Sequence, residues 1–350
     1  MKLFDFLKLS TFSLLFLFVP FLLPIKIFPV SYFNPDWSPD GKLITFEVLG
    51  RFRKNRDVYL VTYQGLSIQQ LTNNLDARNP TWSSDSKQIA FLCKPIKSQK
   101  PRLSDVCVVN LEDLKVRKLT NNGSVSNFTW SPDGKFIAFS ARQGNLRKIY
   151  VVRLSDSKVS QLTSGIKSKD WSPTWSPNHK KIAFDSVSKV RDESKSGSSE
   201  IFLMEAGKPS KLQSIAYGYY PSWSKDSNQI AFYDRRPSLS NPRFNVINMD
   251  DNLSTVVELS TIEKSEHFYS APIWSNDGQK IAFSTVKRRA EKPAIGKIHL
   301  VKTENLSSPQ YIAQGYDFSW SPDSKNIVFS NRGKLLIIDT ESLQITQLKP

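Results

Sequence analysis

The sequence has little of the material from which metal centres and helical domains are built. Among 350 residues there are only two cysteines and three histidines, and no Cys/His spacing is typical of a zinc site. The histidines lie at unrelated places in the chain, His179, His267 and His299, so a three-histidine centre is not expected. We therefore predict no bound metal and no cofactor. Helix signals are nearly absent after residue 30, which indicates a chain made of strands.

The small number of cysteines also limits covalent cross-linking. Cys93 and Cys107 permit at most one intrachain disulfide. Both fall within one repeat of the pattern described below, on strands that are expected to be neighbours. Two states follow from this placement: a cross-strand bridge in an oxidising compartment, or two buried free thiols.

Only one long apolar run occurs, and it lies at the amino terminus. The 17 residues from Leu9 to Ile25 are predominantly apolar, are interrupted by Pro20 and Pro24, and are closed by Lys26. We predict that residues 1–30 are a signal peptide or an N-terminal membrane anchor, in the form of a hydrophobic helix. An uncut anchor is favoured because no small-x-small cleavage site follows. In either case the rest of the chain is expected outside the cytoplasm, on the periplasmic side.

What the sequence has in abundance is one repeated hairpin, seen most clearly at 127–139. Phe128 and Trp130 alternate with polar neighbours, as in a half-buried strand. The segment Ser131-Pro-Asp-Gly134 then supplies turn chemistry, because proline fixes φ, aspartate bonds nearby amides and glycine accepts a positive φ. An apolar strand follows. Since an isolated two-stranded hairpin is marginally stable in water, this hairpin needs neighbours.

The same pattern recurs seven times, with a Trp-Ser pair in each copy. Isoleucine stands seven residues after the tryptophan, phenylalanine nine after, and aspartate three after, except for Asn178 in the fourth copy. The tryptophans are Trp37, Trp82, Trp130, Trp175, Trp223, Trp274 and Trp320. Their spacing of 45 to 51 residues is typical of a four-stranded propeller blade.

We therefore predict an all-β fold: a seven-bladed β-propeller of four-stranded antiparallel blades over residues 31–350, preceded by the N-terminal hydrophobic helix. The blades are expected to begin near residues 34, 79, 127, 172, 220, 271 and 317. Each repeat contains four strands of its own. Ring closure is therefore expected from packing of the seventh blade on the first, or from Ile27–Phe33 adding an outer contact.

The stretch Trp130–Phe139, Trp-Ser-Pro-Asp-Gly-Lys-Phe-Ile-Ala-Phe, resembles the WD40-like repeats of TolB-type β-propellers. Similar repeats occur in the propeller domains of prolyl-oligopeptidase-type enzymes and in oligogalacturonate lyases. The resemblance covers about residues 31–350 and implies the propeller fold, but one fold hosts many functions. TolB has six blades and a preceding α/β domain, whereas this sequence has seven repeats and a hydrophobic segment there. No Gly-x-Ser-x-Gly motif occurs, so a peptidase is not expected.

Strand alternation places every loop between the second and third strands at one end of the ring, together with the amino terminus. These loops are rich in lysine and arginine, and the chain carries a net charge of +16. We predict contacts to an anionic membrane surface, with an anionic polysaccharide as a further possible partner and a solvated loop crown as the alternative. Nucleic acid is not expected, because the chain is exported and aromatics do not interleave with the basic loops. The predicted contact residues are Arg51, Arg53, Lys54, Lys97, Lys100, Arg235, Arg236, Lys287, Arg288 and Arg289.

The connections between blades surround the mouth of the central channel at the same end. They combine aromatic rings with a few charges, which suits a peptide or sugar ligand. The alternative is that the rings cap the channel and pack on each other. The predicted ligand-binding residues are Asp76, Arg78, Asp170, Trp171, Tyr219, His267, Tyr269, Tyr316 and Asp317. No residue is assigned a catalytic role.

These features predict an exported, membrane-anchored and monomeric propeller that acts as a platform for a protein or envelope partner. The alternative is an enzyme acting on a polysaccharide, a lyase or a hydrolase, with its site at the channel mouth. Carboxylate, His and Arg groups that converge at the mouth would favour the enzyme. A flat or plugged mouth would favour the platform.

Overall fold

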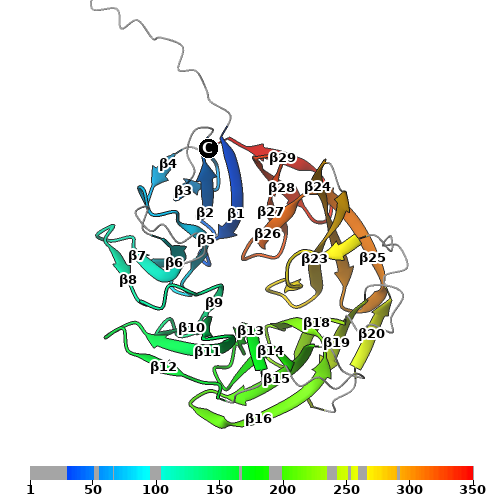
Figure 1. The fold of residues 1–350 in the computed structure, drawn as a ribbon. Coiled ribbons are helices and arrows are strands. Elements are labelled where there is room, and N and C mark those ends of the chain that lie inside the picture. The colour runs from blue at the N-terminus through cyan, green and yellow to red at the C-terminus, as the bar shows by residue number, and fades with distance from the viewer. Residues whose placement is uncertain are drawn as a thin grey trace, which may run out of the picture.

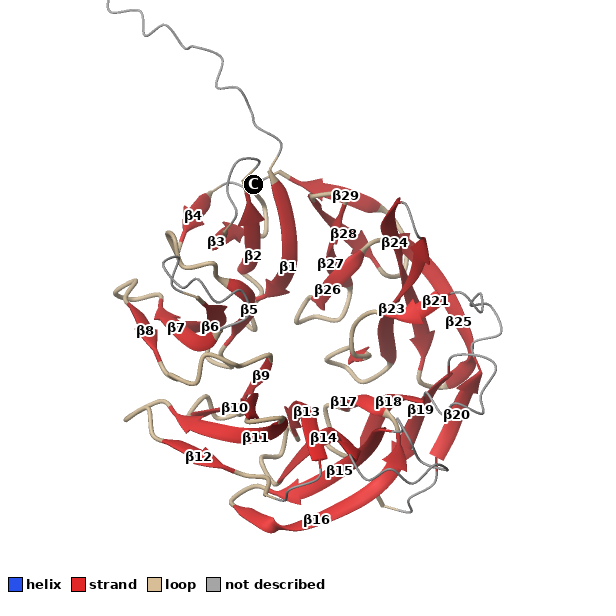
Figure 2. Cartoon of the chain, in the orientation of Figure 1, coloured by secondary structure: helices blue, strands red, loops and turns tan. Residues whose placement is uncertain are grey.

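The structure is a computed structural model that describes residues 30–50, 55–65, 67–94, 104–164, 168–188, 199–234, 243–250, 254–258, 266–289 and 292–349. These ranges contain 29 strands and no helix, and the strands are arranged as successive sheets around a common centre (Figures 1 and 2). Within these ranges there is consequently no helix of the length and apolarity needed to cross a membrane. The predicted N-terminal hydrophobic helix lies outside the described residues.

Four of the repeats form four-stranded antiparallel sheets in sequence order. The strands of the first and second repeats are β1 (Ser31–Trp37), β2 (Leu43–Leu49), β3 (Arg56–Thr62), β4 (Ile68–Gln70), β5 (Arg78–Trp82), β6 (Gln88–Cys93), β7 (Asp105–Asn110) and β8 (Val116–Lys118). Those of the fifth and seventh repeats are β17 (Tyr219–Trp223), β18 (Gln229–Asp234), β19 (Arg243–Asn248), β20 (Ser254–Glu258), β26 (Tyr316–Trp320), β27 (Asn326–Asn331), β28 (Lys334–Asp339) and β29 (Ile345–Leu348).

The other three repeats depart from this arrangement. The third and fourth comprise β9 (Asn127–Trp130), β10 (Phe136–Gln143), β11 (Leu146–Arg153), β12 (Val159–Gln161), β13 (Ser168–Trp175), β14 (Lys181–Ser188), β15 (Ser199–Glu205) and β16 (Lys208–Tyr217). The sixth comprises β21 (Glu266–Phe268), β22 (Ile273–Trp274), β23 (Lys280–Arg289), β24 (Lys292–Lys302) and β25 (Asn305–Gln314).

The fold of antiparallel four-stranded blades is confirmed, but the prediction of seven separate four-stranded sheets is wrong. The described strands form six hydrogen-bonded sheets: four of four strands, one of five and one of eight. The eight-stranded sheet arises because β11 and β13 pair in parallel at Arg147 and Lys169, which joins the third and fourth repeats. The five-stranded sheet arises because the first strand of the sixth repeat is divided into β21 and β22, which both pair with β23.

The hairpin turn is held by a serine as well as by the aspartate that the sequence indicates. Ser131 Oγ donates to Asp133 Oδ1 over 2.6 Å and accepts the Phe136 amide over 2.9 Å. The residue four after each tryptophan has a positive φ in all seven copies, for example Gly134 at 68° and His179 at 65°. His179 is therefore a turn residue.

Tryptophan links neighbouring repeats across most of the seams. In five of the seven copies the indole N–H donates to the carbonyl of the residue that precedes the tryptophan of the previous repeat, as from Trp82 to Asp36 over 3.1 Å. The repeat isoleucine and phenylalanine are at most 1% exposed in every copy. The aromatic hairpins therefore bind the sheets to each other and also form their core.

The ring closes by packing of the last repeat on the first. The Tyr32 amide donates to the Gly333 carbonyl over 3.2 Å, and Ser319 Oγ donates to Asp36 Oδ1 over 2.8 Å. Trp37 shares a core with residues of β27, β28 and β29. Because β1 pairs with β2 and β29 with β28, the described strands of these two repeats pair within their own sheets.

Cys93 and Cys107 form a disulfide between β6 and β7, with their Cα atoms 5.8 Å apart. Of the two states left open by the sequence, the structure has the bridged one.

Candidate functional site

The first strand of most repeats is bulged near the end at which it begins. The residue three before the tryptophan has a positive φ in five repeats, and the first strand of each of these five has a register shift there. A bulge interrupts the ladder and re-aims nearby groups, which leaves them available for contacts with the next repeat. The bulged residues are Asn34, Asn79, Ser172, Tyr220 and Asp317.

Glu47 on β2 is the centre of the contacts between the first repeat and its neighbours. Its side chain is fully buried and forms an ion pair with Arg56 on β3, N to O 2.5 Å. The Asn79 amide of the second repeat donates to the same carboxylate over 2.7 Å, and the Asn34 side-chain amide donates to it as well. The guanidinium of Arg56 also lies over the Phe33 ring, 4.3 Å from its centroid.

Asp317, from the seventh repeat, lies in the same electrostatic environment. Burial is the main cause that raises the pKa of its carboxyl to about 7, and the negative charge of Glu47 raises it further. The positive charge of Arg56 and hydrogen bonds from the Asn34 amide and the Tyr269 side chain oppose this shift. Asp317 therefore carries a proton that is lost near neutral pH.

Two tyrosine rings border this carboxyl. Tyr269 and Tyr316 have ring centroids 5.4 Å apart, and Tyr269 is 45% exposed. Burial, followed by the charge of Asp317, raises the pKa of Tyr269 to about 12, so its hydroxyl stays protonated. We call Asn34, Glu47, Arg56, Tyr269, Tyr316 and Asp317 the Glu47 cluster.

Asp76 and Arg78 border the Glu47 cluster. Asp76 accepts the Arg56 amide over 3.3 Å and pairs with the Arg78 guanidinium at 3.1 Å. The structure thus brings together five of the predicted ligand-binding residues: Asp76, Arg78, Tyr269, Tyr316 and Asp317.

Asp170 and Trp171 belong to a different group of contacts, at the seam between the third and fourth repeats. Lys148 is fully buried and pairs with Asp170 at 3.3 Å. Thr163 and Ser186 each donate a hydroxyl to Asp170 over 2.7 Å. Trp171 lies under the Arg147 guanidinium, which is 4.2 Å from the ring centroid. We call Lys148, Thr163, Asp170 and Ser186 the Asp170 cluster, and its saturated contacts indicate a structural role.

The two remaining ligand-binding predictions fall elsewhere. Tyr219 packs against Tyr220 and Tyr233, with centroids 5.2 and 5.7 Å apart, so it belongs to an aromatic packing group. His267 lies exposed on β21. The carboxylates and the arginine thus converge in the Glu47 cluster without a histidine among its members.

Most of the predicted membrane or anion contacts lie outside the described residues: Arg51, Arg53, Lys54, Lys97, Lys100, Arg235 and Arg236. Lys287, Arg288 and Arg289 lie on β23, and of these the structure describes the side chain of Lys287 alone, which is partly exposed. The membrane-facing prediction stays a prediction.

Sequence reasoning missed Glu47 and the role of Asn34. The signal was present, since Glu47 is the single charged residue in the strand Leu43–Leu49. A charge at such a position is unfavourable unless it is paired. What the sequence did not supply was that Asp317 of the seventh repeat lies near this carboxylate.

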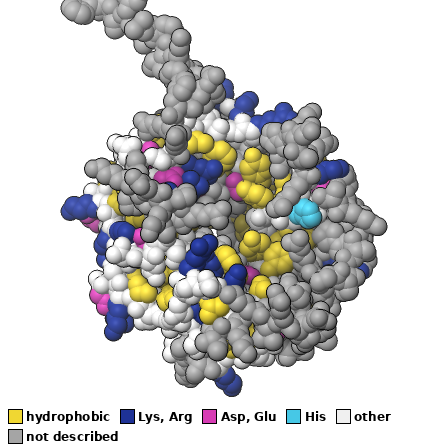
Figure 3. Space-filling view, in the orientation of Figure 1, with side chains coloured by type: hydrophobic (Ala, Val, Ile, Leu, Met, Phe, Trp, Pro, Cys, Tyr) yellow, Lys and Arg dark blue, Asp and Glu magenta, His cyan; other side chains and the backbone are white. Residues whose placement is uncertain are grey.

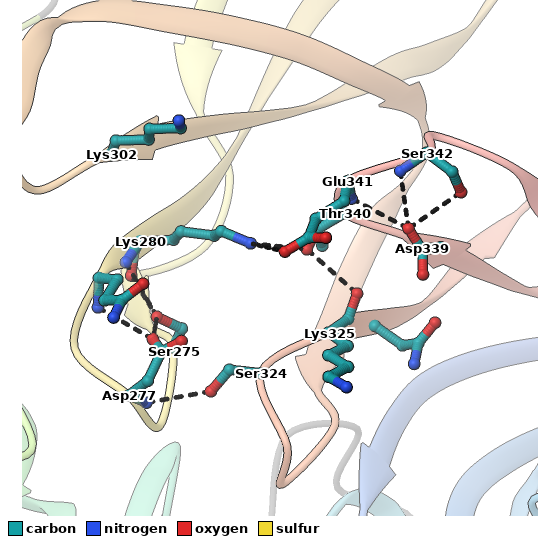
Figure 4. A network of polar contacts seen from close by, with 12 residues as sticks. Ser275, Asp277, Lys280, Lys302, Ser324, Lys325, Asp339, Thr340, Glu341 and Ser342 are labelled. Atoms are coloured by element: carbon teal, nitrogen blue, oxygen red, sulfur yellow. Dashed lines mark hydrogen bonds and ion pairs between the residues drawn. The ribbon is translucent and has the colours of Figure 1, made fainter.

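A second polar region lies at the opposite end of the strands, between the sixth and seventh repeats (Figure 4). It is a cleft of about 990 Å³. Lys280 points into it, donating to Thr340 Oγ1 over 3.1 Å, with the exposed Glu341 carboxylate 4.0 Å away. Lys302 lines the same cleft and pairs with Glu304 at 3.8 Å. Its lining contains four acidic residues and three lysines, so charges of both signs are present and the cleft does not point to a ligand of one charge.

The face shown in Figure 3 carries hydrophobic, basic and acidic side chains around its middle, as expected for a surface of mixed chemistry. Among the described residues there is no group of three or more His, Cys, Asp or Glu side chains placed to hold a metal ion.

Comparison with known proteins agrees with the fold. The family described as TolB beta propeller domain matches residues 24–193 and 79–264, and the chain belongs to this family. No curated protein matches the sequence significantly.

Several solved structures share the fold. The chain is similar to an oligogalacturonate lyase from Vibrio parahaemolyticus, with a TM-score of 0.66 and 14% identity over 90% of this chain and 91% of the other. It is similar to the β-propeller domain of the Trilobed protease from Pyrococcus furiosus, with a TM-score of 0.67 and 15% identity over 92% of this chain and 98% of the other. It is also similar to TolB from Acinetobacter baumannii, with a TM-score of 0.54 and 18% identity over 83% of this chain and 66% of the other. At these identities the likeness concerns the fold alone.

Proposed function

We propose that this chain is an exported, membrane-anchored β-propeller that binds a protein or envelope partner, with the Glu47 cluster as the centre of its binding surface. The observation that carries the proposal is the convergence of charged and aromatic groups from the first, sixth and seventh repeats. Glu47 pairs with Arg56, and Asp317 and Tyr269 come from the seventh and sixth repeats. Such convergence of exposed rings and buried charges on a rigid scaffold is typical of a binding site.

The position of the cluster supports the membrane orientation. Phe33 pairs with Glu47 and Ser31 with Leu49, so the cluster lies at the end of β1 that the hydrophobic segment precedes. The Cys93–Cys107 disulfide supports export, because disulfides persist in oxidising compartments. In this proposal residues 1–30 are the anchor, the basic loops face the anionic leaflet, and residues 31–350 form one domain.

The proposal also treats each of the seven repeats as one blade. The two halves of the eight-stranded sheet, β9–β12 and β13–β16, are each antiparallel, and one parallel pair joins them. A single pair of this kind is a contact between blades that stand close together.

The binding role is tested by site-specific photo-crosslinking of the full-length chain in intact membranes. A photoreactive residue at Tyr269 is compared with one at Lys87, which is exposed on a turn at the opposite end of the strands. We expect one discrete crosslinked species from position 269 that is absent from position 87. Crosslinking of equal intensity at both positions, or at neither, would contradict the proposal.

An enzyme acting on a polysaccharide is the second candidate, and one observation favours it. Asp317, with a pKa of about 7, lies beside Glu47, Arg56 and Tyr269, and a carboxyl poised near neutral pH suits general acid or base catalysis. Incubation with polygalacturonate and other anionic polysaccharides tests this candidate. New ultraviolet absorbance from an unsaturated product, or new reducing ends, that Asp317→Asn abolishes would establish the enzyme. Unchanged substrate would exclude it for the polymers used.

A further inference from the structure

The Glu47 cluster holds more buried negative charge than positive charge. Glu47 is fully buried and its ion-pair partner is Arg56. Among the described residues, no lysine or arginine forms an ion pair with Asp317, whose contacts are the Asn34 amide and the Tyr269 side chain. The nearby pair of Asp76 and Arg78 is neutral by itself. Counted over the described residues alone, the cluster with both acids ionised therefore has one positive charge fewer than negative charges.

The groups beside the unpaired carboxyl are those that a bound cation requires. Tyr269 is 45% exposed, and its ring lies 5.4 Å from that of Tyr316. Aromatic faces attract ammonium and guanidinium groups, the more so where water is partly excluded. The cluster already shows this chemistry, because the Arg56 guanidinium lies 4.3 Å above the Phe33 ring.

We propose that the Glu47 cluster binds one organic cation, an ammonium or guanidinium group, between the Asp317 carboxylate and the rings of Tyr269 and Tyr316. This inference rests on the proposed function and names the chemistry of the partner: a lysine or arginine side chain presented to this end of the ring. A bound cation would supply the missing charge and place all the acids in ion pairs.

Cation binding is coupled to a proton at Asp317. Among the described residues, the charged and titratable groups that face this carboxyl are Glu47 from β2, Arg56 from β3, Tyr269 after β21 and Tyr316 on β26. The carboxyl must be ionised to pair with a cation, and its pKa in the free protein is about 7. Binding therefore strengthens as pH rises from 6 to 8 and releases a proton.

The test measures the affinity of two small probes by ligand-observed NMR, with the full-length chain in nanodiscs of neutral lipid. Benzylammonium carries the charge, and benzyl alcohol has the same ring and no charge. We expect the cation to bind at least about tenfold tighter than the alcohol at pH 8, by ion pairing and cation–π contact. Asp317→Asn should remove this difference, whereas Asp113→Asn, at an exposed turn, should preserve it.

Equal binding of the two probes, or the same effect of Asp317→Asn and Asp113→Asn, would overturn the inference. If Asp317→Asn does not fold, Tyr269→Ala replaces it. This substitution removes a half-exposed ring and should weaken benzylammonium binding by about three- to tenfold. An unchanged affinity would count against the site.

Competition against the photo-crosslink at position 269 separates the inference from the proposed function. If benzylammonium abolishes the crosslink and benzyl alcohol does not, the cation that this site normally binds is a side chain of the protein partner. Probe binding without competition assigns the site to a free amine. A crosslink at position 269 without any preference for the cation would support the binding platform and contradict the proposed cation site.

Discussion

The two carboxylate clusters of the ring differ in how completely their charges are satisfied. Asp170 accepts hydroxyl hydrogen bonds from Thr163 and Ser186 and pairs with Lys148, which is fully buried. Asp317 has no such cation among the described residues, and burial raises its pKa to about 7. A saturated buried ion pair holds two repeats together, whereas an unsaturated carboxyl beside exposed rings retains the capacity to bind.

The Asp170 cluster differs from the corresponding positions of the first two repeats. In the first two repeats a threonine that follows the fourth strand donates to an acid on the third strand of the same repeat, as Thr120 does to Asp105 over 3.0 Å. In the third repeat the residue at this strand position is Lys148, and Thr163 donates to Asp170 of the next repeat. The acid that accepts the threonine hydroxyl therefore belongs to the next repeat and not to the same repeat. This seam also lacks the indole bond, because Trp175 Nε1 is buried without a partner, and the ion pair holds the two repeats together in its place.

Lys148→Met should have the largest effect on stability, because it leaves Asp170 buried without its cation. We expect a loss of about 3–5 kcal/mol in the free energy of unfolding, measured by urea denaturation. The double variant Lys148→Met/Asp170→Leu replaces both charges with apolar groups and should recover most of this loss. If Lys148→Met is as stable as the wild type, the Asp170 cluster does not hold the two repeats together.

Arg56→Met makes the corresponding change in the Glu47 cluster and should cost less. The side chains of Asn34 and the amide of Asn79 continue to donate to Glu47, so the expected loss is about 2 kcal/mol. The same urea titration provides the comparison. A loss of stability larger than that caused by Lys148→Met would contradict our view that the Asp170 cluster is structural and the Glu47 cluster is a binding site.

Asp317→Asn should stabilise the protein at high pH. The folded pKa of about 7 exceeds the ordinary value of 3.8, so the folded state holds the proton more tightly and stability falls as pH rises from about 4 to 7. The amide removes this loss, and the melting temperature at pH 8 should rise by about 2–4 °C. Asp36 and Asp185, each with a pKa raised to about 6 by burial, preserve the pH dependence below 6. The variant and wild type should therefore converge near pH 4, and an equal difference at pH 4 and pH 8 would contradict this account.

Tyr269→Ala should have the smallest effect on stability, about 0.5 kcal/mol or less, because the ring is 45% exposed. Binding of a cation should nevertheless weaken severalfold. Thermal unfolding and the NMR titration together check this pair of outcomes. A large loss of stability would indicate that the tyrosine caps the ring and is a packing residue.

The hairpins could be predicted because their interactions are local. Trp130, Ser131 and Asp133 lie within four residues, and the bonds that define the turn join this segment to itself. The cross-strand neighbours Cys93 and Cys107 followed from the same reasoning. The sequence could not place Asp170 apart from Asp317, because both occupy similar connections between repeats and differ in which side chains the neighbouring repeats present.

The number of sheets was mispredicted for a related reason. Repeat counting treats each copy as isolated, whereas pairing between β11 and β13 depends on how closely two repeats approach. Lys148 and Asp170 form an ion pair across this seam. These residues lie outside the repeated positions that carried the prediction.

The sequence alone determined that this chain repeats one aromatic hairpin and folds as a propeller, because each hairpin is specified within a dozen residues. The tertiary structure alone decided that Glu47 and Asp317, near opposite ends of the chain, share one electrostatic environment. Ring closure brings the first and last repeats into contact. The electrostatic interaction between these two acids depends on their distance in space, which no local pattern in the sequence specifies.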